Sequence, residues 1–182
     1  MRPIRTAVTV FGSLLAAAAL IAVAGLPVYV FPRTDDPAPT DVVVVLGPPR
    51  EERVEEAMRL LDAGLGDALM VSVPSHGKYS AAELDVCTEK HSYPVYCEVP
   101  DPFTTRGEAR WLRQMEETHG WSSATVITFT PHISRARVRM ERCFSGEIRM
   151  IAADPEIPLL EWARQYIYQT SGFVKVAFES DC

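Results

Sequence analysis

One stretch constrains the fold of this chain more than any other: an apolar run, Val42–Leu46, with a turn and an amphipathic segment directly behind it. The run is almost entirely β-branched and has no polar alternation, which is typical of a strand buried on both faces of a parallel sheet. The turn Gly47–Pro49 ends it abruptly. Apolar residues then recur at helical spacing between Val54 and Leu65, so the stretch predicts a buried strand, a tight turn and a helix.

Strands and helices continue to alternate along the chain. We expect strands at 42–46, 68–73, 93–99, 124–129 and 147–152, and helices at 50–63, 80–91, 105–118, 132–143 and 158–178. Ser80 and Glu83 predict a capping box for the 80–91 helix. A wide apolar stripe along 158–178 is expected to pack across the sheet or another helix, and Gly172 could kink that helix. The pattern predicts a Rossmann-like three-layer α/β sandwich with a mainly parallel sheet, whose ligands bind beyond the carboxyl ends of the strands.

The N-terminal part of the chain predicts one transmembrane helix. No charged side chain occurs between residues 6 and 32, and a helix of about 20 apolar residues suffices to cross a bilayer. Arg2 and Arg5 precede this segment, so the positive-inside tendency places the N-terminus in the cytoplasm and the following chain outside it. A cleaved signal peptide is the alternative, because Ala22–Ala24 resembles a cleavage site.

This interpretation divides the chain into a single-pass anchor (1–32), a stiff proline-rich linker (33–40) and an extracytoplasmic domain (41–182). The chain holds 18 basic and 24 acidic residues, with a formal net charge of −6, and only Arg2 and Arg5 of the basic ones precede position 33. The domain is therefore acidic. This argues against general binding of nucleic acids, which requires neutralisation of their phosphates.

Four cysteines are consistent with an exported domain. An even count predicts two disulfides, for which three connectivities exist. Cys87 and Cys97 are close in sequence and flank a predicted helix-to-strand connection, so we pair them, which leaves Cys143 with Cys182. The second bond would stabilise the fold by about 3–4 kcal/mol in the chain-entropy model. No CxxC or clustered His/Cys pattern is present, so we predict no metal site.

The first polar cluster that follows a strand is Gly47–Arg53. A turn into a helix N-terminus is a ready anion site, and Arg53 could point back to the strand ends. However, Pro48–Pro49 remove two N–H donors and Glu51–Glu52 add negative charge, and the turn contains neither a GxGxxG motif nor a Walker lysine. A surface arginine in an acidic helix is the simpler alternative.

The second cluster, Thr104–Glu108, precedes the fourth predicted helix. Thr104 or Thr105 can cap that helix, with Glu108 as the reciprocal partner. The same hydroxyls and Arg106 could instead contact an anionic ligand.

The third cluster lies between Thr128 and Arg135, directly after a buried strand. His132 falls at a helix start, which disfavours the imidazolium and favours a neutral histidine capable of acid–base chemistry. Arg135, Arg139 and Arg142 share one helical face, which is a solvated face in most helices. Because all three clusters follow strands, we expect one shared cleft.

Five short motifs follow one another between about Asp41 and Phe178. They are DVVVVLG, Arg53-x-x-x-Ala57-x-x-Leu60-x-x-x-Gly64, VSV at 71–73, Thr105-x-x-Glu108-Ala109 and Thr128-x-x-x-His132-x-x-Arg135-Ala136. In this order and spacing they resemble the YdcF/SanA/ElyC family, a domain of bacterial envelope proteins, and the N-terminal anchor is similar to that of SanA-type members. The resemblance implies a Rossmann-like fold and an association with envelope integrity and peptidoglycan or surface-polymer biogenesis. It carries over, as cleft residues, Arg53, Ser72, Thr105, His132 and Arg135.

The chain departs from the family pattern at three places. The glycine-rich turn after the first strand is Gly47–Pro49, the Ser-Gly after the second is Ser72–Val73, and a usual asparagine is Glu108. Loss of flexible glycines close to a phosphate site disfavours tight nucleotide binding, although one cytoplasmic branch of the family has been linked to S-adenosylmethionine.

We expect an envelope protein whose cleft binds an anionic component, with no cofactor identified by the sequence. The predicted ligand-binding residues are Gly47, Arg53, Ser72, Thr105, Arg106, Glu108, Thr128 and Arg135, and the predicted catalytic residue is His132. The alternatives are a noncatalytic scaffold with a degenerate site and, third, a nucleotide- or S-adenosylmethionine-binding enzyme.

Overall fold

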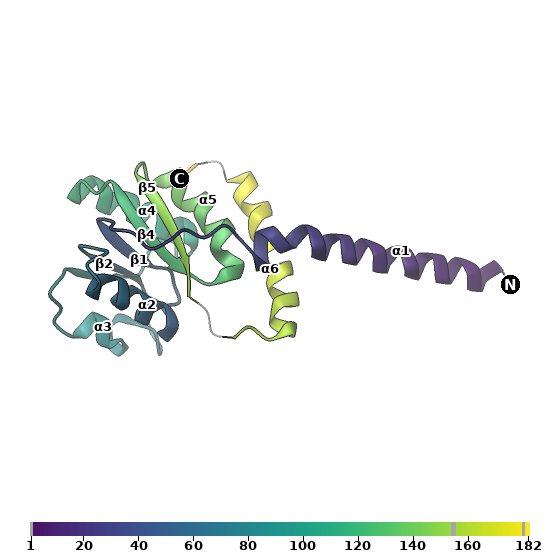
Figure 1. The fold of residues 1–182 in the computed structure, drawn as a ribbon, viewed down its shortest axis with the longest axis horizontal. Helices are drawn as coiled ribbons and strands as arrows, with labels where there is room; N and C mark the ends of the chain where they lie inside the picture. Colours follow the sequence, from purple (N-terminus) through teal and green to yellow (C-terminus); the bar gives the residue numbers. More distant parts are fainter. Residues whose placement is uncertain (1, 154–155, 180) are drawn as a thin grey trace.

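The protein is a Rossmann-like α/β domain with a long N-terminal helix that projects away from it (Figure 1). The computed structural model describes residues 2–153, 156–179 and 181–182, with side chains described from Val10 onward. The strands are β1 (Val42–Val45), β2 (Leu69–Ser72), β3 (Val95–Glu98), β4 (Ser123–Thr128) and β5 (Glu147–Ala152). The longer helices are α1 (Arg2–Gly25), α2 (Glu51–Asp62), α4 (Thr105–His119), α5 (Ile133–Cys143) and α6 (Leu159–Phe178).

The sheet is parallel throughout and has the order β3-β2-β1-β4-β5. Helices cover both of its faces, which confirms the predicted fold class. Val42 and Val44 of β1 pack with α4 and α5, whereas Val43 and Val45 pack with α2 on the other side. All four valines are buried, so the lack of polar alternation in β1 reflects a strand covered on both faces.

The amino-terminal edge of the sheet is fixed by Asp41. Its Oδ2 atom accepts hydrogen bonds from the N–H groups of Ser122 at 2.6 Å and Ser123 at 2.9 Å, and from both serine hydroxyls. These bonds, that of the Ser122 N–H first, lower the pKa of the Asp41 carboxyl. The contact joins the start of β1 to the start of β4 and so sets their register.

The predicted helix at 80–91 is wrong. The segment contains two short pieces, the 3₁₀ turn Ala81–Glu83 and α3 (Asp85–Thr88), and Ser80 makes no capping bond through its side chain. Leu84 separates the pieces with extended backbone, and it packs with Val86 against the sheet face that α2 covers. Tertiary burial of these two side chains has overridden the local helical pattern.

The apolar stripe of α6 does not pack on the sheet, which was one of its two expected partners. Packing on another helix is found in part, because Tyr166 and Phe173 contact Tyr29 in the N-terminal helical region. Leu159, Ile167 and Phe178 are 86%, 75% and 86% exposed, whereas Gln165 and Gln169 face the domain and are buried. α6 runs as one helix through Gly172. It crosses the carboxyl edge of the sheet, where polar groups gather, so its polar side is the one turned inward.

α1 is the part of the described chain that is long and apolar enough to cross a membrane, with a candidate span of Val10–Val30. A signal sequence has the same properties. α1 continues into the π-helical segment η1 (Leu26–Val30), in which Tyr29 is buried against the domain. The following linker also lies on the domain, because Asp35 Oδ2 accepts the Met150 N–H at 2.8 Å and Arg137 Nη2 at 2.6 Å.

Both predicted disulfides are present. Cys87 is bonded to Cys97, and Cys143 is bonded to Cys182 across 39 residues. The first bond joins α3 to β3, and the second joins the end of α5 to the segment that follows α6. An exported domain is the ordinary setting for such bonds.

Candidate functional site

A cleft of about 800 Å³ lies at the carboxyl edge of the sheet, between the strand ends and α6. β1 and β4 are neighbours in the sheet, and the order of the strands reverses between them. Ligands of open parallel sheets bind at such a switch point. The cleft walls come from the turn after β1, the first turn of α4, the 3₁₀ turn Thr130–His132 and the inner side of α6.

Arg53 points back from α2 to the end of β1, as one of the two sequence interpretations proposed. Its Nη1 atom donates to the carbonyl oxygens of Leu46 at 3.2 Å and Pro48 at 3.1 Å. The guanidinium carbon lies 5.0 Å from the ring centroid of Phe129. Arg53 is only 5% exposed, so these contacts hold its charge at the floor of the cleft.

Glu108 is a buried carboxyl group in the first turn of α4. It does not complete a capping box: the N-cap is Thr104, and Glu108 Oε1 instead accepts the Gly47 N–H at 2.7 Å. Burial raises the pKa of Glu108 above 4.5, although the Gly47 N–H, the nearby Ser72 hydroxyl and the charge of Arg53 favour the ionised form. The Ser72 hydroxyl is itself buried and makes no well-formed hydrogen bond to another described residue.

His132 is buried between two threonine hydroxyls. Its Nδ1 lies 3.0 Å from Thr128 Oγ1, and its Nε2 lies 3.2 Å from Thr105 Oγ1. Burial, assisted by the charges of Arg135 and Arg53, holds the pKa of His132 well below 6.5. The imidazole is therefore neutral at physiological pH and carries one nitrogen that can accept a proton.

Arg135 is positioned by a ladder of polar side chains on α6. Its Nε donates to Gln169 Oε1 at 2.8 Å, the Gln169 amide donates to Gln165 at 3.0 Å, and the Gln165 amide donates to Glu161 at 2.7 Å. Burial lowers the pKa of Arg135. Its Nη atoms make no hydrogen bond to any residue that the structure describes, and Arg135 lines the cleft. Tyr168 faces the same guanidinium at 5.9 Å.

Gly172 gives Arg135 the room that it occupies. A Cβ atom at position 172 would lie 2.7 Å from Arg135 Cδ and 2.8 Å from Arg135 Nε. The absence of a side chain at Gly172, rather than a kink, therefore lets the guanidinium pack against α6.

Four other arginines, Arg106, Arg110, Arg139 and Arg142, contact the C-terminal segment, and Arg110 Nη2 donates to the Cys182 backbone oxygen at 2.7 Å. Arg106 pairs with the carboxylate of Asp181, and Arg139 pairs with that of Glu179. Arg142 Nη1 donates to the backbone oxygen of Glu179 at 2.6 Å. Arg106 and Arg139 still border the cleft, but their charge is largely compensated.

Positive charge nevertheless dominates the lining. Seven of the lining side chains are arginine or lysine and four are glutamate, in a chain whose net charge is −6. No group of three or more His, Cys, Asp or Glu side chains that could hold a metal ion occurs in the part of the chain that the structure describes. The electrostatics favour an anionic ligand.

The structure brings most of the predicted site residues together. Gly47, Arg53, Thr105, Arg106, Glu108, His132 and Arg135 line the cleft. Ser72 and Thr128 lie behind it, where they contact Glu108 and His132. The sequence interpretation missed Gln165 and Gln169. Their spacing of four residues on the side of α6 opposite the apolar stripe was the available signal.

Neither a protein-family model, nor a curated protein, nor a solved structure matches this chain.

Proposed function

We propose that this protein is anchored in the cell membrane and binds an anionic, phosphate-bearing component of the cell envelope in its cleft, in support of envelope biogenesis or integrity. The observation that carries the proposal is the gathering of cationic side chains around a cleft in an otherwise acidic chain. Arg53 Nη1 donates to the Leu46 carbonyl oxygen and Arg135 Nε donates to the Gln169 amide oxygen, and guanidinium groups suit phosphate oxygens.

Membership of the YdcF/SanA/ElyC family is part of this proposal. It is supported by the convergence of motifs that are far apart in the sequence: Thr105, Glu108, His132 and Arg135 all reach the same cleft. The proposed topology is single-pass, with the N-terminus in the cytoplasm and the domain outside. The apolar α1 helix and the two disulfides support it.

The binding proposal is tested by thermal unfolding of the full chain in mild detergent. The probes are inorganic phosphate, glucose 1-phosphate, ATP and S-adenosylmethionine. A ligand at 100 times its Kd stabilises the folded state by about 2.7 kcal/mol. We expect the phosphates to stabilise the protein and S-adenosylmethionine to have no effect.

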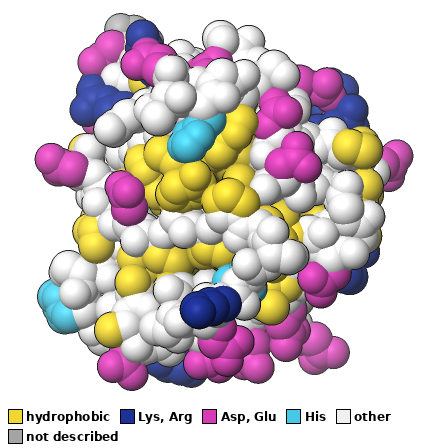
Figure 2. Space-filling view, turned by 90° about the vertical axis from the view of Figure 1, so that its left-hand side faces the viewer, with side chains coloured by type: hydrophobic (Ala, Val, Ile, Leu, Met, Phe, Trp, Pro, Cys, Tyr) yellow, Lys and Arg dark blue, Asp and Glu magenta, His cyan; other side chains and the backbone are white. Residues whose placement is uncertain are grey.

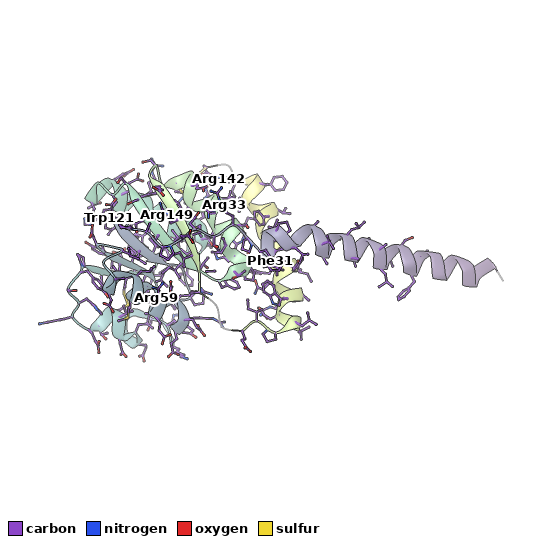
Figure 3. All side chains as sticks on the ribbon, in the orientation of Figure 1. Phe31, Arg33, Arg59, Trp121, Arg142 and Arg149 are labelled. Atoms are coloured by element: carbon purple, nitrogen blue, oxygen red, sulfur yellow. A yellow bond between two sulfur atoms is a disulfide. The ribbon has the colours of Figure 1, made fainter. Side chains whose placement is uncertain are left out.

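Arg135→Ala should weaken phosphate binding by about 10- to 100-fold, because a hydrogen bond to a charged group contributes about 1.5–3 kcal/mol. Arg59→Ala is the matched control: Arg59 is exposed on α2, where it pairs with Glu56, and it does not line the cleft (Figure 3). Equal binding by both variants and the wild type would refute the proposed site, and a response to S-adenosylmethionine alone would favour a cofactor-binding enzyme.

One contact favours a catalytic role in addition to binding. Thr105 Oγ1 lies 3.2 Å from His132 Nε2, while Thr128 fixes the other ring nitrogen. A neutral histidine beside a hydroxyl group can take its proton and make it nucleophilic. Hydrolysis of p-nitrophenyl phosphate by the wild type, with loss in both Thr105→Val and His132→Gln, would support this role. Phosphate binding without turnover would instead identify a noncatalytic binding or scaffold protein.

A further inference from the structure

The amphipathic character of α6 is inverted with respect to the domain. Its inner face is mainly polar: Gln165 and Gln169 are 8% and 0% exposed, and Val176, 4% exposed, is the apolar residue buried beside them. Its outer face is apolar and open. The large apolar residues exposed there are Leu159, Leu160, Ile167, Val174 and Phe178, each more than half exposed. A surface helix in water normally has the opposite arrangement, so this face is built for a partner that is itself apolar.

The outer face of α6 carries no charge along its length. Its polar residues are Thr170 and, at its edge, Ser171, and both hydroxyls donate to carbonyl groups of α6, Thr170 to Tyr166 at 2.6 Å and Ser171 to Tyr168 at 2.7 Å. The cationic side chains Arg164 and Lys175 flank the apolar face, and they are 75% and 65% exposed. Helices that lie in a membrane surface combine an apolar face with flanking basic side chains in this way.

α6 is joined directly to α1. The ring of Tyr166 packs edge-on against Tyr29 with centroids 4.9 Å apart, and Tyr166 Oη donates to the Ala22 carbonyl at 2.9 Å. Gly25 makes the approach possible, because a Cβ atom there would collide with the Tyr166 ring. Phe31, 72% exposed, lies at the same junction (Figure 3). The contact thus fixes α6 at one level along α1.

That level coincides with the expected boundary of a bilayer. The candidate span Val10–Val30 is about 30 Å long at a rise of 1.5 Å per residue, which is the thickness of a hydrocarbon core. The contacts of α6 with Ala22, Gly25 and Tyr29 lie in the C-terminal half of this span. α6 lies across the base of α1, and α1 leaves the domain on the side of the outer face of α6 (Figure 1). The opposite end of the domain carries an apolar area across its middle, with charged side chains around it (Figure 2).

We propose that α6 lies flat on the membrane surface, with its outer face at the boundary between head groups and acyl chains. This inference rests on the membrane anchoring in the proposed function and specifies the kind of ligand. The cleft would open at the level of the lipid head groups, where Arg164 and Lys175 border both the cleft and the membrane. Its ligand is then an amphiphile, whose anionic head enters the cleft while its chain stays in the bilayer.

The test uses tryptophan fluorescence of the full chain in phosphatidylcholine vesicles with or without bromine atoms on the acyl chains. Ile167→Trp places a reporter on the outer face, and Glu117→Trp is the control. Both positions are exposed, and Glu117 lies near the end of α4 at the far edge of the sheet. Brominated lipid should remove at least half of the fluorescence added by Ile167→Trp and little of that added by Glu117→Trp.

Equal quenching of the two reporters would overturn the inference. If Ile167→Trp does not fold, Val174→Trp reports on the same face. Protection of both α6 reporters from quenching, together with a dimer seen by light scattering, would assign the face to a second copy of the chain and also overturn it. Phosphate binding in detergent needs no bilayer, so failure of the membrane contact and failure of the proposed binding function give different results.

Discussion

α4 and α6 are both amphipathic, but they turn opposite faces towards the domain: α4 its apolar face and α6 its polar face. α4 buries Ala109, Leu112 and Met115 against the sheet, and beyond its first turn it exposes polar residues such as Arg110, Arg113 and Glu117. α6 buries Gln165 and Gln169 and exposes its apolar stripe. The comparison teaches that the spacing of residues defines the two faces of a helix, whereas the surroundings decide which face turns inward.

The two helices are consequently held by different forces. Removal of apolar surface from water stabilises α4 on the sheet. α6 is attached through particular bonds: Gln169 with Arg135, Val176 O with Arg142, and Tyr166 with α1. A helix of the first kind tolerates loss of polar groups, and one of the second kind tolerates loss of apolar groups.

The largest expected effect comes from trimming one apolar residue in each helix. Leu112→Ala should lower the free energy of unfolding by about 2–5 kcal/mol, because Leu112 is fully buried. Ile167→Ala should change it by less than about 0.5 kcal/mol in detergent, since its side chain is 75% exposed. Chemical denaturation of the full chain measures both. Similar losses would show that α6 is packed like α4.

A smaller effect is expected where α6 meets the cleft. Gly172→Ala forces the Arg135 side chain to move, so phosphate affinity should fall about tenfold, or about 1.4 kcal/mol. The unfolding free energy should not fall, because alanine is the better helix former by about 1 kcal/mol. Titration with phosphate, monitored by the melting temperature, gives the affinity. Ala163→Ser, on the exposed side of α6, is the control, and equal affinities in the two variants would contradict the prediction.

The smallest effect concerns pH and His132, which is bonded to Thr105 of α4. Its pKa is lowered in the folded state, so below 6.5 the unfolded chain binds the extra proton and stability falls as the pH falls. The stabilisation that neutral His132 contributes is complete above pH 6.5. The uptake of one proton changes the unfolding free energy by at most about 1.4 kcal/mol per pH unit. His132→Gln should remove this part of the slope in unfolding measured between pH 5 and 8.

Glu108 acts in the opposite direction and provides the comparison for that experiment. Its pKa is raised in the folded state, so its contribution is complete below 4.5 and is lost as the pH rises towards the folded value. Glu108→Gln should therefore make stability less sensitive to rising pH. The same change of slope in both variants would mean that these side chains do not titrate as described.

Much of the domain could be predicted because its signals are local. The Val42–Val45 run gave the central strand, and the order of strands and helices gave the parallel sheet. The meeting of Arg53, Glu108, His132 and Arg135 followed from the shared carboxyl edge of such a sheet. Whether a given cluster served as a cap or as a cleft wall could not be predicted, since Glu108 can reach either partner.

Two features depended on distant contacts and could not be predicted. Leu84 breaks the expected 80–91 helix because it packs with Val86 on the sheet. The sequence pattern of the apolar stripe of α6 is the same for a helix that faces a protein core and for one that faces a membrane. The contact of Tyr166 with Ala22, which places this helix, joins residues 144 positions apart.

The Cys143–Cys182 bond has a consequence for where the cleft can exist. Together with β5, it ties α6 to the domain at both ends. In a reducing compartment α6 would be joined covalently to the domain only through β5. The wall of the cleft that α6 forms would then be held less firmly. Formation of the Cys143–Cys182 disulfide would then be the last step in assembly of the cleft, so the protein would bind its ligand only after it has left the reducing compartment in which it is made. A loss of phosphate affinity on reduction, restored on reoxidation, would reveal this dependence.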